Sequence, residues 1–139
     1  MATPTPITDI MTADPRTIER SQNLSEAYHT LKHAAFHHLI VLDGDDVVGM
    51  LATTDILRLA YDADGLAEQS LATYLDHQFN IADAMTETVR TLGVEATAKD
   101  AAEILAEGGF HSIVIIDADG GLAGIVTTTD LARFVVDKL

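Results

Sequence analysis

The sequence contains no cysteine, which excludes disulfides, thiolate metal sites and cysteine nucleophiles and leaves nothing to argue for an oxidising compartment. Basic residues are scarce: 8 Lys and Arg stand against 22 Asp and Glu, giving a formal net charge of −14 at pH 7. A surface of this charge repels phosphate backbones and anionic lipid at long range. We therefore expect neither nucleic acid nor a membrane surface as a partner.

Long apolar segments are also missing. No run of about 18 apolar residues is present, and residues 1–15 have neither the basic start nor the apolar core of a signal peptide. Hydrophobic residues nevertheless make up 47% of the chain, enough for a packed core, so we expect a globular cytoplasmic protein. The acidic excess is compatible with a high-salt cytoplasm and also with an ordinary acidic protein.

The two halves of the sequence repeat each other at a spacing of about 75 residues. Residues 9–45 align with residues 83–119 without a gap, and residues 46–62 align with 121–137 after an insertion. Identical pairs include Asp9/Asp83, Met11/Met85, Thr12/Thr86, Thr17/Thr91, Phe36/Phe110, His37/His111, Gly49/Gly124, Asp55/Asp130 and Arg58/Arg133. This pattern predicts a first repeat over residues 1–62, a linker over 63–80 and a second repeat over 81–139.

Each repeat predicts the same order of elements, β-α-β-β-α. Asn23 and Thr97, each with an acidic residue three positions later, are typical helix N-caps after short β-prone segments. Apolar runs within residues 39–51 and 113–126 predict a hairpin in each repeat, and a Thr-Thr-Asp string then precedes a final helix. Residues 66–75 of the linker are a further candidate helix.

The motifs of both repeats resemble those of CBS domains, the repeats named after cystathionine β-synthase, which as a tandem pair are called a Bateman module. The motifs are Asp-x-Met-Thr at 9–12 and 83–86, Phe-His before the strands at 36–43 and 110–117, and Gly-x-x-x-Thr-Thr-Asp at 49–55 and 124–130. The resemblance covers nearly the whole chain. It implies a mixed α/β (α+β) fold in which two repeats pack with pseudo-two-fold symmetry, and modules that pair into homodimers.

The resemblance also implies two clefts that bind adenosine compounds such as AMP, ADP, ATP or S-adenosylmethionine, each cleft combining residues of both repeats. The residues expected around Asp130 are Thr17, Phe36, His37, His38, Thr127, Thr129 and Asp130 itself. The residues expected around Asp55 are Thr54, Asp55, Thr91, Phe110, His111 and Ser112.

Physical chemistry leaves two roles open for the string 127–130. A helix N-terminus and the hydroxyls of Thr127 and Thr129 can bind phosphate, while the Asp130 carboxylate can accept hydrogen bonds from the vicinal hydroxyls of a ribose. The alternative is that Asp130 only caps its helix. Ala52 replaces the first hydroxyl residue in the other repeat, so we expect the Asp130 cleft to bind the ligand better.

Histidine and arginine give weaker signals. His37 and His111 precede buried strands, where a histidine either contacts a phosphate or makes a structural hydrogen bond. Arg58 and Arg133 lie either in a cleft or on a solvated helix face. His29 and His33 are spaced to share a metal ion on one helix face, but a solvated face is the favoured reading, so we expect no metal site.

No catalytic triad with supporting context, P-loop, dinucleotide-binding glycine motif or zinc-protease motif is present, so we expect no enzyme and no cofactor. The expected function is a regulatory module that senses an adenosine nucleotide or related adenosyl compound and signals to an unidentified effector protein. The alternative is a structural or dimerisation module with vestigial clefts. A homodimer is expected because the two final helices are rich in apolar side chains: Ile56, Leu57, Leu59, Tyr61, Leu131, Phe134, Val135 and Val136.

Overall fold

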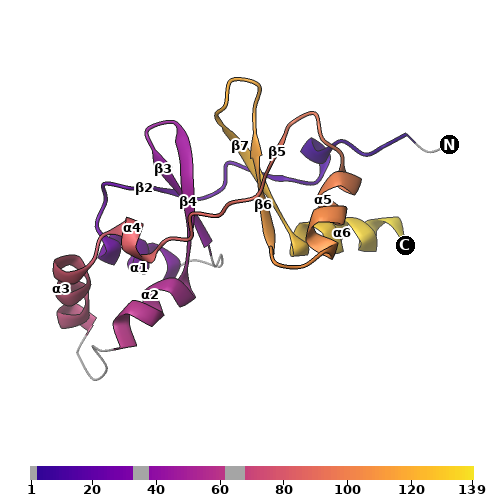
Figure 1. Ribbon diagram of the computed structural model, residues 1–139. Coiled ribbons are helices and arrows are strands. Elements are labelled where there is room, and N and C mark those ends of the chain that lie inside the picture. Colours follow the sequence, from indigo (N-terminus) through magenta and orange to yellow (C-terminus); the bar gives the residue numbers. More distant parts are fainter. Residues whose placement is uncertain (1–2, 33–37, 62–67) are drawn as a thin grey trace. The chain divides into compact units, whose positions relative to one another are not determined.

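The computed structural model describes residues 3–32, 38–61 and 68–139, which form two compact units (Figure 1). Unit 1 comprises Met1–Pro15 and Val89–Leu139, and unit 2 comprises Arg16–Thr88. Phe36 and His37, which belong to the predicted Asp130 cleft, lie outside the described residues, as does His33.

Unit 2 is built on a three-stranded sheet with the order β2-β3-β4. Strand β2 (Thr17–Glu19) is parallel to β3 (His38–Asp43), and helix α1 (Leu24–Lys32) lies between them in the chain. Strand β4 (Asp46–Ala52) pairs antiparallel with β3 across a tight hairpin. Three helices follow β4: α2 (Thr53–Ala60), α3 (Glu68–Gln78) and α4 (Ile81–Ala84).

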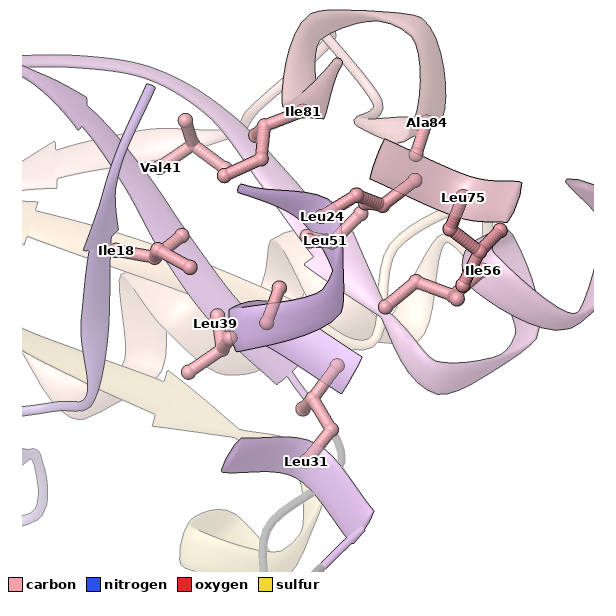
Figure 2. Close-up of a cluster of buried hydrophobic side chains, with 11 residues drawn as sticks. Ile18, Leu24, Leu31, Leu39, Val41, Leu51, Ile56, Leu75, Ile81 and Ala84 are labelled. Atoms are coloured by element: carbon pink, nitrogen blue, oxygen red, sulfur yellow. The ribbon is translucent and has the colours of Figure 1, made fainter. Parts of the chain in front are cut away.

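The core of unit 2 lies where these helices meet one face of the sheet (Figure 2). Leu39 and Val41 of β3 both belong to this core cluster, because alternate strand side chains share one face; Ile40 between them is also buried but lies outside the cluster. Leu39 and Val41 join Ile18, Leu24, Leu51, Ile56, Leu75 and Ile81 in one cluster. Burial of each large aliphatic side chain contributes roughly 1.5–3 kcal/mol. Ile56 therefore belongs to the core and not to the exposed apolar surface of its helix.

Unit 1 is built on a four-stranded sheet with the order β1-β7-β6-β5. Strand β5 (Thr91–Gly93) is parallel to β6 (Ser112–Ile116), with α5 (Ala98–Ala106) between them in the chain, and β7 (Leu122–Thr127) pairs antiparallel with β6. Helix α6 (Thr128–Lys138) follows β7 directly. The N-terminal segment adds the short 3-10 helix η1 (Ile7–Asp9) and strand β1 (Thr12–Ala13), which pairs with β7.

The first segment of each repeat pairs with the sheet of the other repeat. Thr12 lies opposite Ile125 in unit 1, and Met50 exchanges two backbone hydrogen bonds with Thr86 in unit 2, at 2.9 and 2.8 Å. Buried Ile7 fixes the N-terminal segment further, since its N–H donates to the Ala96 carbonyl at 2.9 Å. The compact units are consequently divided differently from the sequence repeats at residues 1–62 and 81–139.

Two glycines permit these segments to lie close to the sheet of the other repeat. A Cβ atom on Gly124 would lie 2.7 Å from Met11 Sδ and 2.8 Å from the Thr12 carbonyl oxygen, both too close for a carbon atom. A Cβ on Gly49 would meet Met85 Sδ at 2.7 Å in the same way. The Met and Gly of the repeated motifs are therefore packing partners, each pair within a single unit.

The mixed α/β class and the β-α-β-β-α order expected from the sequence are confirmed. Thr97 and Asp100 form a capping box at the start of α5, and Gly108 and Gly109 follow that helix with positive φ angles of 82° and 88°. The candidate helix at 66–75 corresponds to α3, which begins at Glu68. Strand β1 and the short helices η1 and α4 were not expected from the sequence.

The glycine contact predicts a stability effect. Gly124→Ala should lower the free energy of unfolding by about 1–3 kcal/mol, because the added methyl group must displace Met11 and the backbone of Thr12. Urea denaturation of the purified chain measures this change. Ala118→Ser, in the exposed turn between β6 and β7, serves as a control and should change stability by less than about 0.5 kcal/mol. Equal effects of the two substitutions would contradict the packing account.

Candidate functional site

Asp130 is a buried carboxylate in the first turn of α6, with 8% of its surface exposed. Its Oδ2 accepts a hydrogen bond from the Thr127 N–H at 2.8 Å and another from the Thr127 hydroxyl at 3.1 Å. In return the Asp130 N–H donates to Thr127 Oγ at 3.2 Å, which completes a capping box. The capping role that the sequence left open is thus present in the structure.

The other carboxylate oxygen, Oδ1, faces donors outside the cap. The Thr12 hydroxyl donates to it at 3.2 Å, and the Arg133 guanidinium lies 3.7 Å away as an ion-pair partner. Three hydrogen-bond donors, two of them from Thr127, thus reach the carboxylate, and the guanidinium adds a positive charge nearby. The negative charge of Asp130 is therefore well compensated despite its burial.

Unit 2 contains the equivalent carboxylate with a different set of partners. Asp55, 7% exposed, accepts from the Ala52 N–H at 2.8 Å through Oδ2 and from Arg58 at 3.0 Å through Oδ1. Ala52 offers no side-chain oxygen, so α2 has no side-chain cap of the kind that Thr127 gives α6. Among the described residues, Asp55 thus accepts from a backbone amide and a guanidinium and from no hydroxyl.

In each unit the predicted polar residues lie at one end of the sheet, where α6 begins in unit 1 and α2 begins in unit 2. Ser112 of β6 lies opposite Thr127, and the carbonyl of His111, directly before β6, accepts from the Thr128 N–H at 3.2 Å, so both residues adjoin the start of α6. Exposed Thr91 pairs with Val114 of the same sheet. The unit 1 members of the predicted site are Thr91, Phe110, His111, Ser112, Thr127, Thr129 and Asp130.

The same end of unit 2 carries the first-repeat residues. His38 lies opposite Ala52, directly before α2, and the exposed Thr17 pairs with Ile40 at the start of β2. Thr54 is exposed in the first turn of α2 and Asp55 follows it. Since each predicted cleft draws residues from both units, the combination of these residues into clefts stays a prediction.

Thr12 is a hydrogen-bond partner of Asp130 that the sequence did not reveal. Its identity with Thr86 in the repeat was visible, but its partner Asp130 is 118 positions away and belongs to the other repeat. Only the pairing of β1 with β7 brings the two together. Local patterns carry no signal for such a contact.

The described part of the chain contains no group of three or more His, Cys, Asp or Glu that could hold a metal ion. Within the same ranges, no helix is long and apolar enough to cross a membrane. His29, a member of the weighed metal pair, makes an edge contact with the Tyr28 ring at 6.3 Å between centroids.

Residues 7–62 and 81–137 match the model of the CBS domain. The chain belongs to the CBS domain family. Both repeats are matched, which confirms the resemblance drawn from the motifs and makes the chain a tandem CBS pair. Among curated proteins, an uncharacterized 17.7 kDa protein of Acidianus ambivalens is 28% identical over 134 residues, covering 96% of this chain and 74% of that protein.

Other relatives are longer than this chain. A homoserine O-acetyltransferase of Methanohalobium evestigatum is 26% identical over 130 residues, which span 93% of this CBS pair but only 24% of the enzyme. A likeness confined to a quarter of that protein does not carry its activity to this chain.

Solved CBS pairs share the fold. CBSX2 in complex with AMP is 24% identical with a TM-score of 0.77, and the match covers 96% of this chain and 98% of CBSX2. The CBS domain pair of protein MJ0100, in complex with 5′-methylthioadenosine and S-adenosyl-L-methionine, is 22% identical with a TM-score of 0.77. That match covers 99% of this chain and 100% of the MJ0100 chain.

The unequal caps of the two final helices predict opposite stability effects. Thr127→Ala removes the capping hydroxyl of α6 and should lower the free energy of unfolding by about 1 kcal/mol. Ala52→Thr supplies the missing hydroxyl to α2 and should raise the free energy of unfolding by up to about 1 kcal/mol. Chemical denaturation of both variants measures the effects, and a destabilised Ala52→Thr variant would show that the two helix starts are not equivalent.

Proposed function

We propose that this CBS pair is a regulatory module that binds an adenosine nucleotide or a related adenosyl compound and signals its presence to a separate effector protein. The observation that carries the proposal is the buried carboxylate of Asp130 at the N-terminus of α6, an eleven-residue helix. Its Oδ1 points away from the cap toward donors that a ligand can replace. The AMP complex of CBSX2 and the S-adenosylmethionine complex of MJ0100 support the choice of ligand class.

The polar groups around Asp130 suit the two ends of a nucleoside phosphate. A ribose diol would donate to the carboxylate, because a carboxylate accepts charge-assisted hydrogen bonds and repels phosphate. The phosphate would bind at the N-terminus of α6, where the helix dipole favours an anion, although the N–H groups of Thr128 and Asp130 already donate to His111 and Thr127. Thr129, exposed in that turn, is the hydroxyl available for phosphate, since the Thr127 hydroxyl is engaged in the cap.

The remaining members of the Asp130 cleft are proposed on the family pattern: Thr17, Phe36, His37 and His38 of the first repeat. The second cleft is proposed around Asp55 with Thr54, Thr91, Phe110, His111 and Ser112. It should bind less well, since Ala52 offers no hydroxyl and Arg58 already donates to Asp55 at 3.0 Å. We assign the module a binding role and no catalytic one.

We further propose that the functional unit is a homodimer. Large apolar side chains remain exposed on both final helices: Leu57 (52%) and Tyr61 (82%) at α2, and Val135 (50%) and Val136 (70%) on α6. Exposed apolar side chains of this size on two helices are typical of a protein interface. A purely structural or dimerisation module is the alternative, favoured by the absence of a hydroxyl at Ala52 and by the scarcity of basic residues.

Calorimetric titration with AMP tests the proposed function. The chain should bind AMP, and Asp130→Ala should weaken binding by about 1.5–3 kcal/mol, because the ribose loses a charged acceptor. The matched variant Asp55→Ala should weaken it less. S-adenosylmethionine, ADP and ATP are titrated in parallel, because the ligand class includes them.

One control separates binding from folding. The free energy of unfolding of each unliganded variant is measured, because loss of the helix cap alone costs about 1 kcal/mol, and the titrations are compared only where each variant is folded. A chain that binds none of the four compounds is a structural module. Abolition of binding by Asp55→Ala but not by Asp130→Ala reverses the assignment of the clefts.

A further inference from the structure

The Asp130 carboxylate has few acceptor positions that a ligand hydroxyl can use. Both donors to Oδ2 come from Thr127 and belong to the cap of α6, so replacing either one opens the first turn of the helix. Oδ1 faces groups outside the cap: the Thr12 hydroxyl donates to it at 3.2 Å, while Arg133, at 3.7 Å, is an ion-pair partner beyond hydrogen-bond distance. Among the described residues, the Thr12 hydroxyl is therefore the donor with which a ribose hydroxyl would compete at Oδ1.

Thr12 is the group that a ligand would displace from Asp130 most easily. It is a neutral hydroxyl, and an incoming ribose hydroxyl replaces it like for like, whereas displacing the guanidinium of Arg133 would also remove a positive charge from beside a buried carboxylate. Thr12 is exposed and lies in the two-residue strand β1, which pairs with β7 at the edge of the sheet.

Thr12 lies at the start of the connection between the two units, so its displacement would act on that connection. Unit 1 ends its N-terminal part at Pro15, and Arg16 begins unit 2, so residues 12–16 join the edge of one sheet to the other unit. Asp14 within this connection has a positive φ of 52°, an uncommon conformation for a residue with a side chain. Ile7 and Met11 hold the preceding residues in unit 1, which confines any change to the connection itself.

Resting on the function proposed above, we propose that Thr12 occupies the ribose position of Asp130 in the free chain and is released when an adenosine ligand binds. Thr12 is then a positioning residue that links occupancy of Asp130 to residues 12–16, the connection between the two units. The effect is specific to one repeat. The equivalent residue in unit 2, Thr86, pairs with Met50 through its backbone, and within the described residues Asp55 accepts from Ala52 and Arg58 instead.

Titration of AMP into the full chain and into Thr12→Val tests this assignment. Valine keeps the β-branched shape and removes only the hydroxyl, so AMP no longer competes with Thr12 for Oδ1. The dissociation constant should fall by about three- to tenfold. Thr12→Ser, which keeps a hydroxyl, should bind AMP like the wild-type chain, and the matched control Thr86→Val should leave the affinity unchanged.

Hydrogen exchange supplies a second readout that a merely structural role would not move. AMP should speed amide exchange in residues 12–16 of the wild-type chain, and the same residues of Thr12→Val should exchange fast with or without AMP. Weaker or unchanged AMP binding by Thr12→Val, or protection of residues 12–16 by AMP, overturns the assignment while leaving the proposed function intact. A wild-type chain that binds neither AMP nor S-adenosylmethionine overturns both.

Discussion

The close approach of a methionine to a glycine is the contact on which the other features of each unit depend. Met11 packs on Gly124 and Met85 packs on Gly49, in each case where a Cβ atom would not fit. This approach lets the first segment of one repeat lie against the sheet of the other, as β1 does on β7. The hydroxyl of Thr12, next to Met11 in the chain, reaches Asp130 as a result.

Asp130 serves both the fold and the proposed function, because one carboxylate oxygen caps a helix and the other is directed away from that cap. Oδ2 caps α6 and fixes the carboxylate in the first turn of the helix. Oδ1 is directed away from the cap, where a neutral hydroxyl and a more distant guanidinium balance its charge. A carboxylate fixed in this way is preorganised for a ribose diol, since the ligand need not order it. At Asp55 the capping hydroxyl is missing and Oδ1 accepts a hydrogen bond from a closer guanidinium, which distinguishes the two repeats.

Local sequence patterns were sufficient to predict the elements of each repeat. The capping box of Thr97, the glycines after α5 and the apolar hairpin strands all depend on residues a few positions apart, and all are found in the structure. The position of Asp130 at the start of the final helix followed from the same kind of pattern.

Features that depend on distant pairing could not be predicted. Strand β1 has two residues and no distinctive apolar alternation, and its pairing with β7 joins residues more than a hundred positions apart. The contact of Thr12 with Asp130 follows from that pairing and was missed for the same reason. Ile56 was grouped with the exposed apolar residues of its helix, because sequence alone does not show which face of a short apolar helix meets the sheet.

The most direct test of this account is a crystal structure of the full chain with AMP bound. The account predicts ribose hydroxyls within hydrogen-bond distance of Asp130 Oδ1, the Oδ2 contacts with Thr127 intact, and the Thr12 hydroxyl no longer within hydrogen-bond distance of the carboxylate. AMP bound away from Asp130, or bound there with the contact between Thr12 and Asp130 preserved, would contradict it.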